Sequence, residues 1–187
     1  MVFGRLVEFR SKIHVRPLEM RDAPEVFRAI DESRVEVSRW MDWCRPTYGL
    51  RETEEWIRAS LDGSDEGTCY QFGIFAGRRF VGSCGLSRVD PAACVANLGY
   101  WVRTSAAGQG VAPEAARRVI EWAFVHTNIE RIEILAAVGN RRSQRVAEKI
   151  GAVKEGVLRR RLAVFGRYHD AVIYSVVRGD TLAPLEG

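Results

Sequence analysis

The sequence predicts one α/β domain in which helices flank a mixed β-sheet. Apolar periodicity along the chain gives the order strand, two helices, three strands, helix, strand, helix and two strands. A helix connects two strands in the second half, which usually makes such strands parallel. With 187 residues the chain is long enough for one core and too short for two full-sized domains. We therefore treat residues 1–187 as a single domain.

The first half is expected to contain a strand, two helices and three further strands. Apolar and polar residues alternate over Ile13–Leu18, which is typical of a short strand. Asp22 followed by Pro24 resembles a helix start, with an acidic cap and an early proline. A second helix is expected from Arg51, and the glycines of the segment 63–67 end it. The three strands are expected at Tyr70–Phe75, Phe80–Leu86 and Val95–Val102.

The second half alternates helices with strands. Apolar residues recur every three or four positions between Ala112 and Ala123, which predicts a helix. A shorter helix is expected over Arg141–Ile150, ended by Gly151. The last eight residues, 180–187, are expected to form a loose tail. The remaining strands are expected at Ile132–Val138, Val153–Leu158 and Ala171–Val177.

Composition excludes several classes of protein. The four cysteines form no C-x-x-C pair, so neither a zinc site nor a disulfide framework is expected, and no metal is expected. The N-terminus lacks the apolar core of a signal peptide, and no apolar run reaches the ~18–20 residues that span a bilayer. We expect a soluble cytoplasmic protein without a membrane partner.

The positive charge lies in the second half of the chain. Residues 1–100 carry 14 basic and 15 acidic side chains, a net charge of −1, whereas residues 101–187 carry 14 and 9, a net charge of +5. Of the basic side chains, 25 are arginine and 3 are lysine. Codon usage with a solvated surface is one explanation. An anionic ligand of the second half is the other, because the arginine fork binds two phosphate oxygens at once.

A small-residue loop precedes the helix that begins near Ala112. Gly108 and Gly110 lack side chains, so the loop backbone can approach a ligand closely. The helix start that follows offers free N–H groups and the positive end of the helix dipole, which together suit a phosphate. The spacing does not fit a P-loop, and Pro113 stands where a dinucleotide fingerprint needs a third glycine.

A second group of residues begins at Asn140. Asn140, Ser143 and Ala147 are three and four positions apart, so they share one face of the short helix. Asn140 follows a strand and precedes the helix, where asparagine is most often an N-cap. Capping does not prevent its side chain from also contacting a ligand.

These segments resemble the GNAT N-acetyltransferase superfamily, in particular its RimJ/RimL-like branch. The loop Ser105-Ala-Ala-Gly-Gln-Gly110 is similar to the family's pyrophosphate loop, with Ser105 in place of the leading Gln or Arg. The downstream N-x-x-S, E-K-x-G and E-G motifs are similar to Asn140-Arg-Arg-Ser143, Glu148-Lys-Ile-Gly151 and Glu155-Gly156. The resemblance covers most of the chain and implies a GNAT-like sheet, acetyl-CoA as donor and a primary amine as acceptor.

The resemblance also implies roles for individual residues. Backbone groups of Trp101, Val102 and Arg103 would lie along the pantetheine arm and the acetyl carbonyl, and Asn140 would hydrogen-bond the pantetheine. The family's Tyr acid is replaced by Ala147, so Ser143 becomes the candidate acid for the leaving thiolate. The pyrophosphate loop would consist of Ala106, Ala107, Gly108, Gln109, Gly110 and Val111.

The acceptor is the least determined part of this interpretation. The expected reaction is direct attack by an amine in a ternary complex, and the branch favours a protein N-terminus of ribosomal-protein type. Trp40 and Tyr100 are candidate acceptor contacts. Glu155, His169 or a water molecule are candidate bases, with a surface ion pair as the plainer role for Glu155.

Three alternatives remain open at this point. The acceptor can be a small amine such as a polyamine or aminoglycoside. The chain can also be a non-catalytic module that binds an acyl-CoA. Nucleic-acid binding is unfavoured, because Arg159-Arg-Arg161 lacks an aromatic platform and is more typical of a solvated charge run. The sequence does not determine oligomeric state, and a homodimer stays open.

Overall fold

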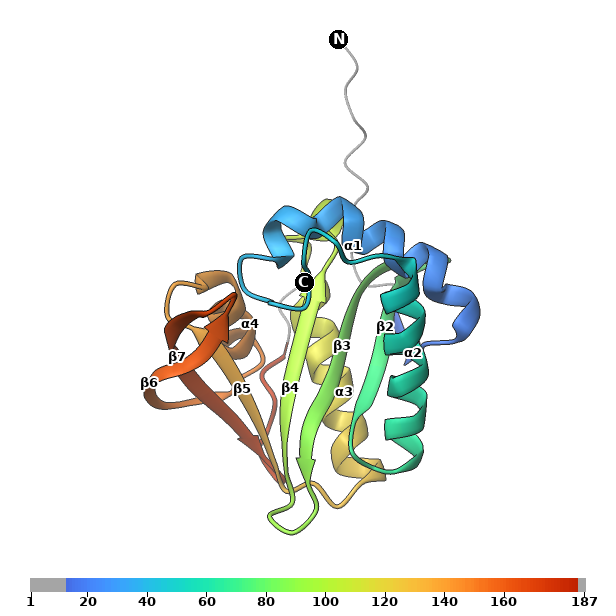
Figure 1. Ribbon diagram of the computed structural model, residues 1–187. Helices are drawn as coiled ribbons and strands as arrows, with labels where there is room; N and C mark the ends of the chain where they lie inside the picture. The colour runs from blue at the N-terminus through green and yellow to red at the C-terminus, as the bar shows by residue number, and fades with distance from the viewer. Residues whose placement is uncertain (1–12, 185–187) are drawn as a thin grey trace.

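Seven strands form one mixed sheet in the order β1-β2-β3-β4-β5-β7-β6. The computed structural model describes residues 13–184. Its element order confirms the predicted succession of strands and helices and the mixed α/β class (Figure 1). The strands are β1 Ile13–Pro17, β2 Tyr70–Ala76, β3 Arg79–Asp90, β4 Val95–Val102, β5 Arg131–Ala137, β6 Val153–Val164 and β7 Arg167–Val177. The helices are α1 Ala23–Val37, α2 Leu50–Asp65, α3 Val111–His126 and α4 Arg141–Lys149.

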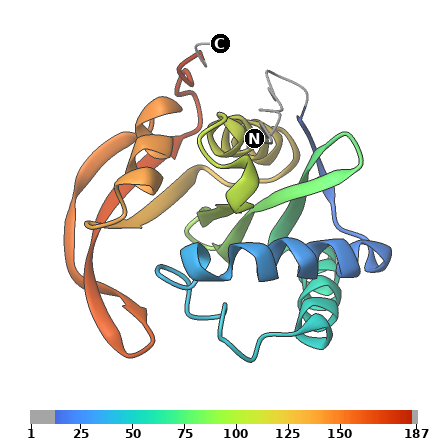
Figure 2. The same cartoon turned by 90° about the horizontal axis from the view of Figure 1, so that it is seen from above.

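Helices cover both faces of the sheet and bury a core on each (Figure 2). Side chains alternate along β4, as they must in a strand, so its two faces enter different cores. Leu98 joins the core that contains α3. Trp101 joins the core formed by α1 and α2, where its ring centroid lies 5.7 Å from that of Phe80. Strand β4 is therefore the element that connects the two layers.

The expected parallel pair is β4 and β5, connected by α3. Parallel pairing covers only the first three residues of each strand, Val95–Asn97 against Arg131–Glu133. The Asn97 amide, at the last of these pairs, donates a hydrogen bond to the Glu133 carbonyl at 3.2 Å. Beyond this point the strands diverge (Figure 1), so the sheet is open between the second halves of β4 and β5.

Strand β6 is longer than the sequence pattern predicts. The expected strand ends at Leu158, whereas β6 continues to Val164 through the polar run Arg159–Arg161. Because β6 is at the edge of the sheet and is largely exposed, polar residues on both faces cost little. The register shifts between Leu158 and Leu162, so the arginines form a bulge in the hairpin with β7.

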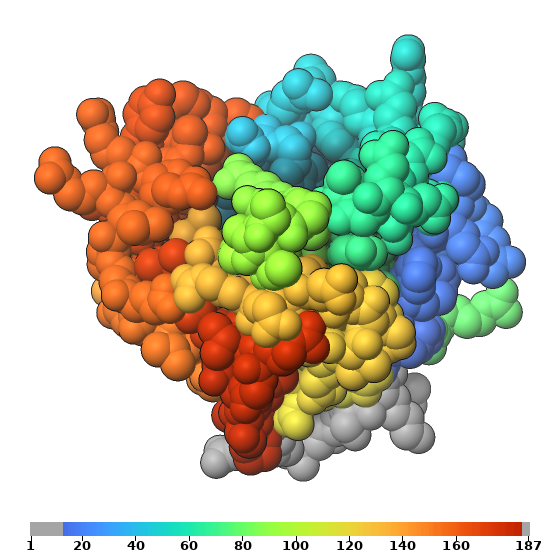
Figure 3. Space-filling view, turned by 90° about the horizontal axis from the view of Figure 1, so that it is seen from below, coloured from blue at the N-terminus to red at the C-terminus, as the bar shows by residue number. Residues whose placement is uncertain are grey.

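The C-terminal segment is attached to the domain as far as it is described. In place of the loose tail expected over 180–187, the backbone of Ala183 donates to the Ile150 carbonyl at 3.1 Å and accepts from Arg117 at 3.2 Å. Leu182 packs against the α3 core. Figure 3 shows this red segment lying against the yellow α3 helix. The last three residues of the expected tail lie outside the described part of the chain.

Candidate functional site

The glycine loop between β4 and α3 has the conformation that its sequence requires. Gly108 and Gly110 have φ values of 79° and 76°, in the left-handed region that glycine adopts without strain. Gly110 is the N-cap of α3, and the first helical bond that returns to it comes from the Glu114 amide at 3.2 Å. The amides of Val111 and Ala112 therefore precede the helical ladder, and they are oriented as an anion site requires.

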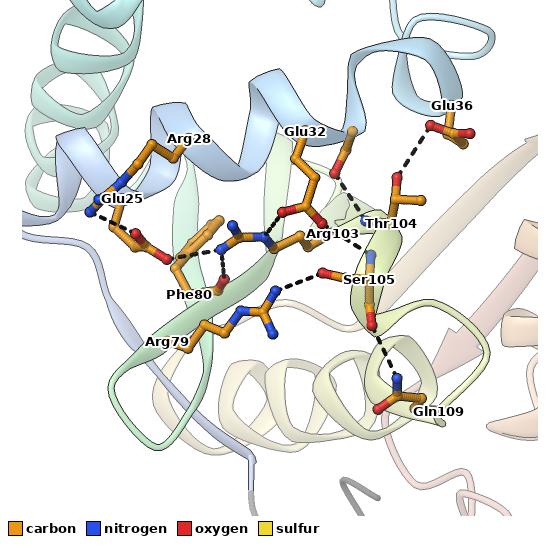
Figure 4. Close-up of polar contacts among 11 residues, drawn as sticks. Glu25, Arg28, Glu32, Glu36, Arg79, Phe80, Arg103, Thr104, Ser105 and Gln109 are labelled. Atoms are coloured by element: carbon orange, nitrogen blue, oxygen red, sulfur yellow. Dashed lines mark hydrogen bonds and ion pairs between the residues drawn. The ribbon is translucent and has the colours of Figure 1, made fainter. Parts of the chain in front are cut away.

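Ser105, which stands at the loop's atypical position, is held by three different segments (Figure 4). Its hydroxyl accepts a hydrogen bond from Arg79 at 2.7 Å, and its amide donates to Glu32 at 3.2 Å. Its carbonyl accepts from the Gln109 amide group at 3.1 Å. The Gln109 side chain therefore closes the loop on itself, and its buried Oε1 has no partner among the described residues. These contacts fix the loop without the family's leading Gln or Arg.

Arg103 ties the start of this loop to α1. Its guanidinium donates to Glu32 at 2.6 Å and to Glu25 at 2.9 Å, and the side chain is 12% exposed (Figure 4). The amide of the next residue, Thr104, donates at 3.0 Å to the buried hydroxyl of Ser33. Partial burial alone would raise the pKa of Glu32, but hydrogen bonds from Ser105 and Arg103 lower it overall. We call Arg103, Glu25 and Glu32 the α1 clamp.

The opposite face of β4 brings Tyr100 against α4. The Tyr100 hydroxyl donates to the Ser143 carbonyl at 2.9 Å and lies 3.1 Å from the Ser143 hydroxyl. Burial raises the pKa of Tyr100, so its phenol stays protonated at neutral pH. The Asn140 side chain accepts from the Ser143 amide at 3.2 Å, so Asn140 is the N-cap of α4. The structure thus brings together Ser143, Asn140 and Tyr100, with Tyr100 beside the candidate acid.

Trp40 packs against the turn between β5 and α4. A Cβ added to Gly139 would lie 3.1 Å from the Trp40 ring, so the indole packs against the turn that leads into Asn140. The ring also makes an edge contact with His169 of β7 at a centroid distance of 6.1 Å. The α1–α2 connection therefore reaches the C-terminal strands at the end where β4 and β5 are apart (Figure 2).

Of the candidate bases, Glu155 is engaged elsewhere. The Arg131 guanidinium donates to both of its oxygens at 2.7 and 2.5 Å, and the Ser175 hydroxyl donates at 2.7 Å. These hydrogen bonds, that of Arg131 first, lower the pKa of Glu155 to about 2. A carboxylate of this acidity is a poor base for an ammonium group, and Glu155 forms the surface ion pair that was its plainer interpretation. His169 retains its place near the open end.

Several polar contacts of this site have no signal in the sequence. The α1 clamp joins residues 71 and 78 positions apart, and the Tyr100–Ser143 pair joins residues 43 positions apart. Arg79, the first residue of β3, likewise contacts the loop through Ser105, 26 positions away. Among residues 13–184, no group of three or more His, Cys, Asp or Glu side chains is placed to hold a metal ion. No described helix is long and apolar enough to cross a membrane.

Comparison with known proteins agrees with this geometry. Residues 12–153 match the family described as the acetyltransferase (GNAT) domain. A Bacillus subtilis (strain 168) protein, YdaF, whose name describes it as a ribosomal N-acetyltransferase, is 31% identical over 173 residues, 89% of this chain and 91% of its own. The ribosomal-protein-serine acetyltransferase of Escherichia coli (strain K12) is 24% identical over 87% of this chain and 86% of its own.

Solved structures show the same fold. RimL, a ribosomal L7/L12 α-N-protein acetyltransferase solved with coenzyme A, superposes with a TM-score of 0.84 at 20% identity, over 90% of this chain and 95% of its own. The microcin C7 self-immunity acetyltransferase MccE, solved with acetyl-CoA and AMP, has the same TM-score at 23% identity, over 90% and 93% of the two chains. The chain is therefore a member of the GNAT family and an acetyl-CoA-dependent N-acetyltransferase.

Proposed function

We propose that this enzyme acetylates the N-terminal α-amine of a polypeptide by direct attack on acetyl-CoA in a ternary complex. Two relatives carry names that refer to ribosomal proteins, and the one at 31% identity matches nearly the whole chain. An α-amine also suits a site in which Glu155 is held by Arg131 and Ser175 and is therefore not free to act as a strong base. The α-amine's pKa of about 8, against about 10.4 for a lysine, leaves part of it neutral at physiological pH, so it needs only a weak base.

The observation that carries the donor side is the opening between β4 and β5. The β5-facing backbone groups of β4 beyond Asn97 have no strand partner there. The pantetheine amides would pair with the backbone of Trp101 and Val102, as an added strand pairs with a sheet edge. The Arg103 backbone is engaged elsewhere, because its amide donates to the Val81 carbonyl and its carbonyl accepts from the Ala106 amide, each at 2.8 Å. Residues 106–111 would hold the pyrophosphate, and the four exposed basic side chains of α4 would face the remaining negative charge. These four are Arg141, Arg142, Arg145 and Lys149.

At the reacting centre, backbone N–H groups at the end of β4 would polarise the acetyl carbonyl. The Ser143 hydroxyl would donate to the thiolate as the thioester bond breaks. Tyr100 would orient that hydroxyl, because it is the side chain in contact with Ser143. The amine loses one proton to His169 or to water. The thiolate gains one proton from Ser143, which regains it from solvent.

Direct attack is favoured over an acylated cysteine. Cys84 is a cysteine of the neighbouring strand β3 and pairs with Tyr100 of β4. It is fully buried, and burial raises its pKa, so no thiolate forms there at neutral pH.

The test is release of CoA thiol with a panel of acceptors. Peptides that begin with Ser or Ala are compared with the same peptides acetylated at the N-terminus, with a peptide that offers only a lysine amine, and with a polyamine and an aminoglycoside. We expect turnover with the free N-termini and intersecting lines when both substrates are varied. Turnover with small amines alone would favour the small-amine alternative, and CoA binding without turnover would favour the non-catalytic module.

A further inference from the structure

Nine basic side chains of the segment 141–167 form no ion pair with the acidic residues that the structure describes. This segment carries nine basic and two acidic residues. Within the described part of the chain none of the nine forms an ion pair, whereas Arg103, Arg117, Arg118, Arg131 and Arg178 all do. Figure 3 shows long side chains of this orange segment projecting into solvent. The positive charge of the second half is therefore concentrated in α4 and the β6–β7 hairpin.

The hairpin arginines occupy a built feature of the backbone. In β6, Leu158 pairs with Ala171 and Leu162 pairs with His169, so Arg159–Arg161 stand opposite the single residue Asp170. The Asp170 carboxylate accepts a hydrogen bond from the Arg160 amide at 2.8 Å, and Arg160 has a φ of 49°. Asp170 thus neutralises no guanidinium. It stabilises a bulge that presents three consecutive arginines, which is one known use of a bulge at a sheet edge.

This bulge is close to the end of the sheet where the acceptor is expected. The Asp170 carbonyl accepts from the Val138 amide at 2.9 Å, and Val138 is two residues before Asn140. His169, the neighbour of Asp170, contacts Trp40. Figure 2 shows the hairpin curving round the same side of the molecule as the α1–α2 connection. A polypeptide whose first residue lies beside the contacting rings of Trp40 and His169 would leave the site along the hairpin.

We infer that the arginine bulge, defined as Arg159, Arg160 and Arg161 together with Arg167 at the start of β7, binds an acidic stretch of the acceptor polypeptide. All four side chains belong to exposed residues. Arg160 stacks over the Tyr168 ring at 5.4 Å, and none of the four guanidinium groups forms an ion pair within residues 13–184. Charge complementarity therefore identifies the partner as a carboxylate-rich segment. The inference rests on the proposed polypeptide acceptor and adds its composition beyond the N-terminal residue.

A protein partner fits these observations better than RNA does. The bulge adjoins the acceptor end of the sheet through Asp170, so the acceptor itself passes over it. Single-stranded RNA is usually held by aromatic platforms as well as charge. The exposed rings of the hairpin are Phe165 and Tyr168, and Arg160 already stacks over Tyr168.

The experiment uses three peptides that share their N-terminal residues and differ downstream in an acidic, a neutral or a basic stretch. We expect the native enzyme to prefer the acidic over the neutral peptide by about tenfold in kcat/KM at low salt, the sum of a few exposed ion pairs, and to lose this preference as salt rises. The variant Arg159→Ser/Arg161→Ser/Arg167→Ser is expected to treat both peptides alike while acetylating the neutral one at the native rate.

A matched control changes two exposed arginines elsewhere, Arg58→Ser and Arg78→Ser, and should keep the preference. Equal use of acidic and neutral peptides by the native enzyme overturns the inference and leaves the proposed function standing. Absence of turnover with every peptide overturns both. Retention of an RNA oligonucleotide that the triple variant loses, without any preference for acidic peptides, overturns the inference in favour of nucleic acid.

Discussion

The α1 clamp offers the sharpest test of how the cofactor loop is organised. The substitution Arg103→Met keeps most of the aliphatic stem and removes the guanidinium. Glu25 then keeps its ion pair with Arg28 at 2.8 Å, whereas Glu32 retains only its bond from the Ser105 amide. We expect the connection of the loop to α1 to weaken while the rest of the fold persists, because the bonds from the Thr104 and Ser105 amides to Ser33 and Glu32 remain.

The magnitude follows from the contacts that are lost. Hydrogen bonds to charged groups contribute about 1.5–3 kcal/mol each when buried. The two glutamates are 29% and 33% exposed, so water replaces part of the interaction and the contribution falls toward the ~0.2–1 kcal/mol of surface pairs. A total loss of about 2 kcal/mol is expected, which for a chain of this size lowers Tm by about 4–8 °C.

Affinity for acetyl-CoA should fall as well, because the released loop must be ordered on binding. Fixing the backbone of one residue costs about 1–2 kcal/mol, so the Kd should rise about tenfold. The assay is calorimetric titration with acetyl-CoA beside a thermal scan. The matched control is Arg131→Met, since Arg131 also pairs with two glutamates, at 3.0 and 2.5 Å, but at the end of β5 remote from Asn140.

The control is expected to lose stability and to keep the native Kd. If Arg103→Met loses stability but binds acetyl-CoA with native affinity, the clamp only supports the fold, and the reasoning that the loop is held ready by α1 is refuted.

Three further outcomes are expected. Gly110→Ala forces a φ of 76° on alanine, so it should destabilise the protein by about 1–2 kcal/mol and also weaken acetyl-CoA binding in the same titration. The control Gly77→Ala, at a φ of 60° and with equal space around its Cβ, should lose stability but keep the native affinity for acetyl-CoA. Tyr100→Phe should lower kcat by about tenfold with an unchanged KM for acetyl-CoA in steady-state assays, since it removes the hydroxyl that orients Ser143; an unchanged kcat would contradict that role. Because the folded-state pKa of Glu155 is about 2, below its ordinary value of 4.5, its stabilising contribution is complete above pH ~4.5 and is lost as the pH falls toward 2. Glu155→Gln should flatten that part of the stability curve measured by chemical denaturation, and a curve as steep as the native one would assign the acid sensitivity to other carboxylates.

Local patterns were sufficient for the features that depend on neighbouring residues. The glycine loop and the start of α3 follow from backbone freedom and free amides, and the parallel pair follows from the helix between its strands. The short helix after Asn140 likewise follows from its cap, since the Asn140 side chain bonds an amide only three residues on.

Contacts between distant segments could not be predicted in this way. Nothing near Glu155 in the sequence indicates that Arg131, 24 residues earlier, occupies both of its oxygens. The pairing of Tyr100 with Ser143 depends on how α4 packs against β5 and α3, which is set by the whole core. The predicted strand ended before the true end of β6 for a different reason. A run of arginines lacks the apolar residues typical of a strand, and it is accommodated in β6 because β6 lies at the exposed edge of the sheet.

The short pairing of β4 with β5 also has a consequence for folding cooperativity. Three residue pairs are the only strand pairing between the part of the chain up to α3 and the part from β5 onward, within the described sheet. Regions joined by so few bonds can open separately, which native-state hydrogen exchange detects as different protection levels. A ligand that spans the opening contacts both regions, so the amide protons of α4 should exchange more slowly in its presence than those of α2. With ligand bound, the two regions would then open together, and their amide protons would show similar levels of protection from exchange.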